Sequence, residues 1–259
     1  MHREGKTAAV TGQTFRCCVV IPVYDHELAI GAVVAAVLRQ SIPLILVDDG
    51  SQAACATELD RLAAESSRQI DLVRLDHNQG KGVAVLAGFR RAGELGFTHV
   101  LQVDADGQHC IDDIPRFLAA AMSRPDAVIA GCPIYDASVP KSRLYARYLT
   151  HVFVWINTLS LEIRDSMCGF RVYPLPAVLK LMKRQPIGKR MNFDTDILVR
   201  LYWQGCRVIN LPTAVTYPSD GVSHFRLWFD NLLITRMHTV LFFGMLLRLP
   251  MLLARKVIR

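Results

Sequence analysis

The sequence has no C-x-x-C pair, although it contains seven cysteines. An odd number of scattered thiols is unlike a disulfide framework or a zinc site, so we expect reduced thiols in a cytosolic setting. The first 16 residues are polar and lack the apolar segment of a secretory signal, so no signal peptide is expected there. The cysteines are Cys17, Cys18, Cys55, Cys110, Cys132, Cys168 and Cys206.

Charge is also scarce, since 20% of the 259 residues are charged and 51% are hydrophobic. This balance excludes intrinsic disorder and supplies the core of one large domain. The net charge is +7, and residues 225–259 hold six Lys or Arg against one Asp, which is +5 of that excess. Nucleic-acid binding is disfavoured, because the basic residues are confined to an apolar tail and are not spread over a face.

Short β-rich runs alternate with longer helical patterns between Cys17 and about Leu211. This alternation is typical of a Rossmann-like α/β fold, with a mostly parallel sheet flanked by helices. In such a sheet, the loops after the carboxyl ends of the strands meet at one edge, where ligands bind. The runs expected to form strands are 18–21, 44–47, 72–75, 100–103, 127–130 and 208–211.

Two carboxylates and an amide follow the fourth of these runs. Asp104 and Asp106 are two positions apart in an extended segment and therefore share a face, and Gln108 follows two residues later. Oxygen ligands of this kind suit Mg²⁺ or Mn²⁺ carrying a diphosphate. The competing interpretation is a turn in which an aspartate caps a helix. The metal site is favoured because the pair ends a strand of apolar character.

Polar loops also follow the second and third runs. A carboxylate at Asp48 or Asp49 can hydrogen-bond a ribose hydroxyl or a base, and a strand-to-helix cap is the alternative. Residues 78–82 contain two glycines that let the backbone approach a phosphate, with Lys81 as the counter-charge. Their spacing differs from that of a P-loop, which disfavours an NTPase.

Asp194 and Asp196 stand at the start of a predicted helix whose apolar positions include Ile197, Leu198 and Leu201. A carboxylate in the first turn can simply cap the helix. It can equally be a general base that takes a proton from an acceptor hydroxyl. The residues alone leave both interpretations open.

The order of these motifs resembles that of a family 2 glycosyltransferase with the GT-A fold, especially the dolichyl- or polyprenyl-phosphate mannose and glucose synthase branch. The resemblance covers roughly 17–225. It implies that the nucleotide pocket contains Pro22, Tyr24, Glu27 and Asp48 or Asp49. It also implies a metal on Asp104, Asp106 and Gln108, Arg171 near the sugar and the acceptor, and Asp194 as the base with Asp196 as second choice.

Two segments depart from that branch. Its members usually carry Gly-Ser-Arg after the fifth strand, where this chain has Gly131-Cys132-Pro133, and Arg143 remains as a phosphate contact. A Gly-x-Ser-Lys pattern becomes residues 221–224, so that His224 replaces a fixed cation. Both changes weigh against a polyprenyl-phosphate acceptor. The chain is also similar to glycosyltransferases of bacterial aryl-polyene or xanthomonadin-type clusters.

The expected reaction is inverting, metal-dependent transfer of a hexose from a UDP- or GDP-linked donor to a lipid-like acceptor. Transfer to polyprenyl phosphate is the first alternative. A sugar nucleotidyltransferase is the second, and it is disfavoured because residues 22–31 lack a Gly-rich loop with Arg and Lys. The oligomeric state is left open.

The tail predicts a membrane-associating segment. Its apolar run from Val240 to Leu247 is interrupted at Arg248 and falls short of the roughly 20 residues that span a bilayer. Amphipathic helices lying on the cytoplasmic face of the cell membrane are therefore expected. Core or oligomer-interface helices, or a span with Arg248 reaching the headgroups, are the alternatives. The predicted organisation is a flexible 1–16, a GT-A domain over 17–224 and a basic amphipathic tail over 225–259.

Overall fold

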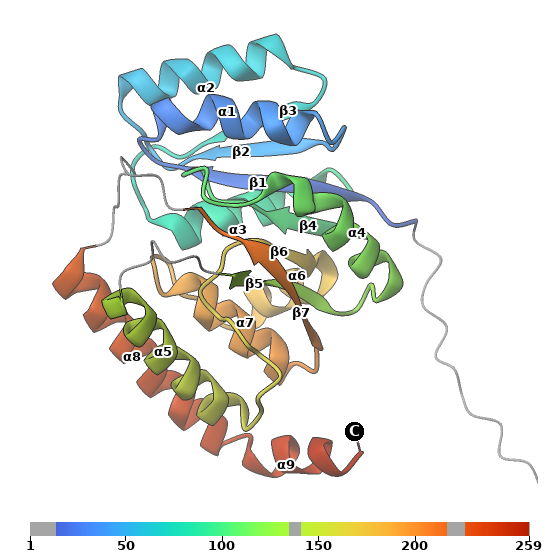
Figure 1. Cartoon of the computed structure of the whole chain (residues 1–259), viewed down its shortest axis with the longest axis vertical. Helices are drawn as coiled ribbons and strands as arrows, with labels where there is room; N and C mark the ends of the chain where they lie inside the picture. Colours follow the sequence, from blue (N-terminus) through green and yellow to red (C-terminus); the bar gives the residue numbers. More distant parts are fainter. Residues whose placement is uncertain (1–13, 135–140, 217–225, 259) are drawn as a thin grey trace, which may run out of the picture.

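The structure, a computed structural model, describes residues 14–134, 141–216 and 226–258, without the side chains of 141–146, 257 and 258. Within these ranges, helices cover both faces of a seven-stranded mixed sheet (Figure 1). The strands are β1 (Cys17–Val23), β2 (Leu44–Asp48), β3 (Ile70–Arg74), β4 (His99–Gln102), β5 (Val128–Ile134), β6 (Arg171–Pro174) and β7 (Val208–Ala214). The helices are α1 (Glu27–Leu38), α2 (Ala53–Glu65), α3 (Lys81–Glu94), the short η1 (Ile111–Asp113), α4 (Ile114–Ser123), α5 (Lys141–Thr158), α6 (Leu175–Arg184), α7 (Phe193–Trp203), α8 (Leu227–Leu246) and α9 (Leu249–Ile258).

The strand order is β3-β2-β1-β4-β6-β5-β7. β6 pairs antiparallel with β4 and β5, and the other neighbouring strands pair in parallel. The predicted mostly parallel sheet and its six expected strands are therefore confirmed. β6 was not expected from the sequence, because its four residues begin with an arginine and end with a proline, which is a poor strand signature.

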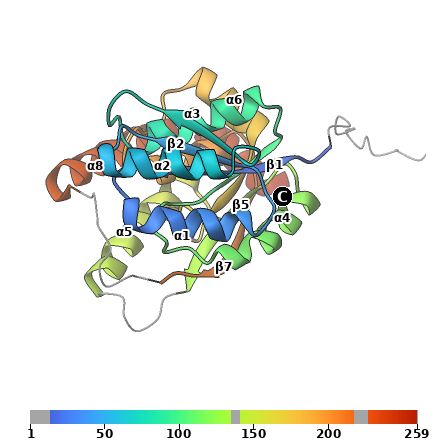
Figure 2. The same cartoon turned by 90° about the horizontal axis from the view of Figure 1, so that it is seen from above.

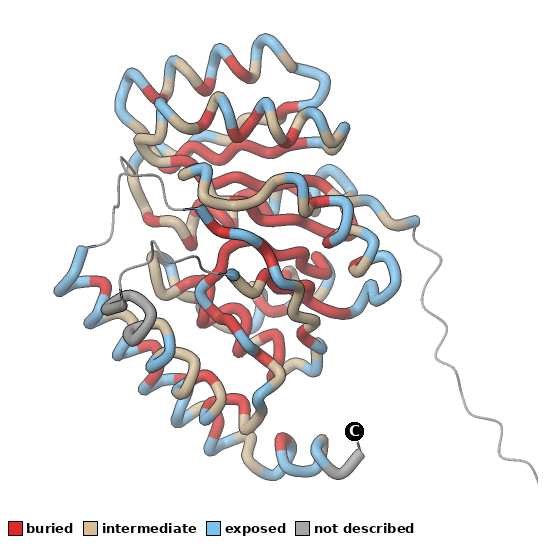
Figure 3. The backbone as a smooth tube through the Cα atoms, in the orientation of Figure 1, coloured by how far each residue is buried: buried red, intermediate tan, exposed pale blue. Residues whose placement is uncertain are grey.

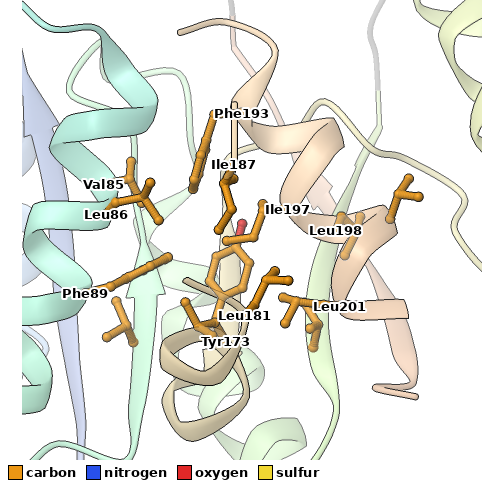
Figure 4. Close-up of a cluster of buried hydrophobic side chains, with 14 of the residues drawn as sticks. Val85, Leu86, Phe89, Tyr173, Leu181, Ile187, Phe193, Ile197, Leu198 and Leu201 are labelled. Carbon is orange, nitrogen blue, oxygen red and sulfur yellow. The ribbon is translucent and has the colours of Figure 1, made fainter. Parts of the chain in front are cut away.

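Each face of the sheet has its own hydrophobic core. Alternate residues of β1 point to opposite sides, so Val20 joins the core under α3, α6 and α7, while Val19 joins the core under α1, α2 and α4. The buried backbone runs through the central strands (Figure 3). On the α3 side, Tyr173 of β6 stands among aliphatic side chains of α6 and α7 and next to Phe89 of α3 (Figure 4).

The predicted tail forms two helices that share this core. α8 packs against α5 and α7, and Figure 2 shows α8 and α5 at the same side of the molecule. α8 buries Met237, Leu241 and Met245 in the cluster under α7. The other side of α8 is also rich in exposed apolar side chains, so the helix is hydrophobic nearly all round. The boundary between 224 and 225 stays a prediction, because residues 217–225 lie outside the described ranges.

A buried histidine lies in the contact between α5 and α8. His238 stacks against Phe153, and its Nδ1 lies 3.4 Å from the Asn157 amide nitrogen. Burial lowers the pKa of His238 to about 4, below the usual value near 6.5. Between these values the unfolded state binds a proton that the folded state does not, so stability falls as pH drops from about 6.5 to about 4. Going from pH 7 to 5, we expect the Tm of the wild type to fall about 3–6 °C further than that of His238→Phe. Equal decreases in thermal melts of the two proteins would refute this role.

Candidate active site

The polar loops predicted to converge do meet at one edge of the sheet, because β1, β2 and β4 are parallel and end there. Asp49 follows β2, and both of its oxygens accept backbone N–H groups, from Gln79 and from Gly80, at 2.8 Å each. Burial raises the pKa of Asp49, and the two backbone hydrogen bonds oppose this increase. Asp49 thus fixes the loop after β3 against the loop after β2.

Asp48 is buried and also has protein partners. Its Oδ1 accepts the Ser51 N–H at 2.8 Å, and its Oδ2 accepts the Arg74 Nε at 2.9 Å. Both aspartates therefore order the loops that would surround a nucleotide. Their predicted contact with a base or ribose stays a prediction.

The loop after β1 is tied to the loop after β2. Asp25 has a φ of 50°, and it joins the next loop by donating its N–H to Ser51 Oγ and accepting the Gln52 N–H. Three predicted nucleotide-pocket residues lie in or near this loop, with Pro22 buried in β1, Tyr24 half-buried after it and Glu27 exposed at the start of α1. Their predicted roles are compatible with this placement and are not tested by it.

The centre of the site is a lysine between two carboxylates. The Lys81 Nζ at the start of α3 lies 2.9 Å from Asp104 Oδ2 and 2.8 Å from Asp194 Oδ2. Asp104 follows β4 and Asp194 begins α7, so Lys81 joins three elements. The predicted base and the first predicted metal ligand are therefore brought together.

The electrostatics of this centre favour ionised groups. Burial alone would raise the pKa of Asp104, but the Lys81 ammonium and His109 outweigh it and hold this pKa well below its usual range. Burial likewise opposes the charge on Lys81, and the two carboxylates raise its pKa above the usual value. His109 Nε2 lies 3.4 Å from Asp104 Oδ2. The Asp104 carboxylate is thus an anion held near a cation.

The donor set of the D-x-D-x-Q segment fits a hard divalent cation. Asp104 is ionised and one-fifth exposed, and Asp106 accepts the Gln108 N–H at 3.0 Å in a tight turn. Among the described residues, no group of three or more His, Cys, Asp or Glu side chains is placed to hold a metal. Two carboxylates and an amide leave coordination positions for phosphate oxygens and water, which is the usual mode of Mg²⁺ binding with a nucleotide.

A glycine makes room for Asp104. A Cβ at Gly169 would lie 2.5 Å from Asp104 Oδ2 and 2.6 Å from Oδ1, distances that no side chain can tolerate. The segment before β6 therefore packs its backbone directly on the carboxylate. It is held there by Asp165, whose carboxylate pairs with Arg147 at 2.6 Å and accepts the N–H groups of Met167 and Cys168.

Other predicted site residues have different surroundings. Arg171 is fully buried and donates from Nη1 to the Asp194 backbone oxygen at 2.6 Å, so it lies beneath the site. Asp196 pairs with Arg200 at 2.7 Å and accepts the Gly188 N–H, which gives both of its oxygens to protein donors. The Arg143 side chain and all of His224 lie outside the described part of the chain, so their predicted acceptor contacts stay predictions.

Gln102, Tyr173 and His109 were not expected at the site, although Gln102 and His109 lie next to its carboxylates and Tyr173 binds Gln102. Gln102 is the one polar residue in the apolar run 100–103, and a buried amide there is a signal that could have been used. Tyr173 went unnoticed together with β6. His109 belongs to no motif in the sequence, and only the fold brings its Nε2 to 3.4 Å from Asp104 Oδ2.

A family model described as glycosyl transferase family 2 matches residues 18–190. The polyprenol monophosphomannose synthase of Mycolicibacterium smegmatis is 26% identical over 232 residues, covering 85% of this chain and 84% of that protein. The undecaprenyl-phosphate mannosyltransferase of Micrococcus luteus is 27% identical over 214 residues, covering 80% and 86%.

Solved structures show the same fold. A glucosyl-3-phosphoglycerate synthase from Mycobacterium tuberculosis, in complex with Mn²⁺, UDP and phosphoglyceric acid, has a TM-score of 0.65 at 14% identity and covers 89% of this chain and 78% of its own. A mannosyltransferase from Pyrobaculum calidifontis, in complex with GDP-mannose and Mn²⁺, has a TM-score of 0.56 at 15% identity and covers 80% and 58%. The expected GT-A fold is confirmed by these similarities.

Proposed function

Because this chain belongs to glycosyltransferase family 2, we propose that it transfers a hexose from a UDP- or GDP-linked donor to a lipid-linked phosphate, with inversion at the anomeric carbon. The observation that carries this proposal is the cluster of Asp104, Lys81 and Asp194 at the carboxyl edge of the sheet. The relatives named for polyprenol and undecaprenyl phosphate support the phosphate acceptor, despite the departures at 131–133 and 221–224.

Three groups of the site would bind the diphosphate of the donor: the two aspartates through a metal, Lys81, and the backbone at Gly80. Asp104 and Asp106 would hold a Mg²⁺ or Mn²⁺ ion, which neutralises charge on a departing diphosphate when bound. The Lys81 ammonium lies beside Asp104, where it adds a second positive charge near the same diphosphate. The loop fixed by Asp49 brings the backbone of Gly80 to this point, and the φ of 104° at Gly80 requires a glycine. The site thus favours departure of an anionic nucleotide.

The acceptor follows from the state of Asp194. Its Oδ2 is bound to the Lys81 ammonium, and its Oδ1 accepts the Gln102 amide at 3.0 Å. A general base must be within hydrogen-bond reach of the hydroxyl that it deprotonates, whereas both Asp194 oxygens already bind protein donors. A phosphate acceptor is already ionised and requires no base. We therefore assign Asp194 the role of holding Lys81, in place of the general base expected from the sequence.

Asp194→Asn tests this assignment. The amide keeps the shape of the side chain but loses the charge that holds Lys81, so we expect kcat to fall by about tenfold and its pH dependence between pH 6 and 8 to stay that of the wild type. Steady-state transfer to a polyprenyl phosphate is the measurement. A loss of about 1,000-fold or more, with a pH limb removed, would instead identify Asp194 as a general base and overturn its assignment as the partner of Lys81 alone.

We further propose that the protein works as a peripheral enzyme at the inner face of the cell membrane. Large exposed apolar side chains of α5 and α8 include Tyr148, Leu149, Phe153, Trp228, Leu232 and Phe243, here called the apolar surface. Three basic residues are exposed nearby in the sequence, with Arg226 just before α8, Arg236 on α8 and Lys256 on α9, which suits anionic headgroups. Two other basic residues contact the protein, since Arg248 lies over the Trp203 ring and Arg255 binds the carbonyl groups that end α7.

Among the described helices, none is by itself long and apolar enough to cross a bilayer. α8 and α9 meet the length and composition requirement only as a pair, with a bend of 71° between them.

Vesicle binding tests the apolar surface. Trp228 is 88% exposed and Leu232 is 67% exposed, so Trp228→Ser/Leu232→Ser should leave the fold intact while removing apolar area from the bilayer contact. We expect cosedimentation with phosphatidylcholine–phosphatidylglycerol vesicles to weaken by about tenfold or more. Leu28→Ser is the matched control, because Leu28 is 94% exposed on α1, far from α8 (Figure 1). Equal binding by both variants, or none by the wild type, would contradict the proposal.

A further inference from the structure

A buried glutamine links the two carboxylates of the site from below. Gln102 ends β4 and is fully buried. Its Nε2 donates to Asp194 Oδ1 at 3.0 Å and lies 3.4 Å from Asp104 Oδ1. These are the oxygens that Lys81 does not contact, since Lys81 binds Oδ2 of each aspartate. The two carboxylates are therefore bridged twice, by an ammonium and by an amide.

The amide is itself held in one orientation. Gln102 Oε1 accepts the Tyr173 hydroxyl at 3.3 Å, and that hydroxyl oxygen accepts Arg171 Nη1 at 3.3 Å. The register of β4 and β6 pairs Gln102 with Arg171 and Val100 with Tyr173, so the three polar residues occupy adjacent positions on one face of the two strands. The Arg171 cation polarises the Tyr173 hydroxyl, which in turn polarises the Gln102 amide. Such a series strengthens the hydrogen bonds that the amide N–H groups donate to the carboxylates.

The same arginine holds the backbone that carries one carboxylate. Arg171 Nη1 donates to the Asp194 backbone oxygen at 2.6 Å, so the series fixes Asp194 at both its main chain and its side chain. The surroundings make this arrangement costly. Arg171 and Tyr173 are fully buried, and among the described residues Arg171 Nε and Nη2 have no hydrogen-bond partner. Apolar side chains surround Tyr173 (Figure 4). Buried polar groups of this kind destabilise a core, so their presence points to a role that apolar residues could not fill.

We propose that Gln102 is a positioning residue for the transfer reaction. Its amide sets the spacing of Asp104 and Asp194 so that Lys81 bridges them, and Tyr173 with Arg171 sets the amide. This role rests on the proposed function, because it concerns the geometry of the same site. It also accounts for a buried arginine, tyrosine and glutamine that the proposed reaction does not otherwise use.

Gln102→Met removes the amide donors and keeps the length of the side chain. We expect kcat to fall by about 100-fold, because a displacement of about 1 Å in a catalytic group can lower the rate by this factor. The KM for the donor should stay within about threefold of the wild-type value. Tyr173→Phe leaves the amide but frees its orientation, and we expect a smaller loss of about tenfold. Because both substitutions act through the same amide, the double variant should be no slower than Gln102→Met alone.

Thr98→Val is the matched control. Thr98 directly precedes β4, and the substitution removes a buried hydroxyl that binds the Arg16 backbone, away from the carboxylates. It should lower Tm and leave kcat unchanged. Multiplicative losses in the double variant, or a kcat for Gln102→Met equal to that of the wild type, would overturn the proposal.

Crystal structures of the wild type and Gln102→Met give a readout that does not depend on turnover. We expect the Asp194 carboxylate to move by about 1 Å or more or to become disordered. Unchanged positions of both carboxylates would overturn the positioning role. A wild type that releases no nucleotide from any donor would refute the proposed function instead, and the structures would still decide the role of Gln102.

Discussion

Asp104→Ala is expected to lower kcat for donor cleavage by about 1,000-fold or more. The substitution removes the first ligand of the proposed metal site and one of the two carboxylates that hold Lys81. Both positive charges near the departing diphosphate are therefore displaced by one change. Release of UDP or GDP from the cleaved donor, followed under saturating Mn²⁺, is the measurement.

A surface aspartate provides the control for Asp104. Asp71 pairs with Arg91 at 2.8 Å on the outer strand β3, and Asp71→Ala removes an equal charge far from the site. We expect it to change stability by less than about 1 kcal/mol and to leave kcat as it is. If Asp104→Ala retained the activity of Asp71→Ala, the assignment of the metal site would be wrong.

Gly169→Ala is the second substitution for which we expect a large effect, although it adds only one methyl group. The new Cβ would meet the Asp104 carboxylate at 2.5 to 2.8 Å, so either the carboxylate or the segment before β6 must move. Because a displacement of about 1 Å in a catalytic group can cost a factor of about 100, we expect at least that loss in kcat.

Gly31→Ala is the matched control, because it adds the same methyl group to a glycine of α1. Its Cβ would approach only the end of the flexible Glu58 side chain, at 3.3 Å, and alanine is the better helix former. This control should keep full activity and gain slightly in Tm. Full activity in Gly169→Ala would show that the close packing on Asp104 has no bearing on catalysis.

The strand ends of the sheet were predictable because local sequence determines them. Asp49, Asp104 and the loop at Lys81 each follow a run of β-branched and aliphatic residues, and parallel strands bring such loops together. The Rossmann-like class, the six expected strands and the convergence of the loops at Asp49, Lys81 and Asp104 could therefore be inferred from the sequence. Asp194 was linked to this site only through the family resemblance.

The contacts between those residues could not be predicted in the same way, because they depend on long-range pairing. Lys81 was expected to face a phosphate, whereas the structure places it between Asp104 and Asp194, 23 and 113 residues away in the chain. Arg171 was expected beside the sugar, but it is buried because it belongs to the unpredicted strand β6. Pairing of a short antiparallel strand inside a parallel sheet leaves no periodic signal in four residues.

The most direct test of the proposed reaction is an assay of the purified full chain with polyprenyl phosphate in anionic vesicles. A panel of UDP- and GDP-hexoses is supplied with Mn²⁺ or with a chelator, and released nucleotide and labelled lipid are measured together. We predict that at least one donor gives nucleotide and glycolipid in equal amounts, and that the chelator abolishes both. Release of no nucleotide from any donor in the presence of Mn²⁺ would contradict the assignment of this chain as an active, metal-dependent hexosyltransferase.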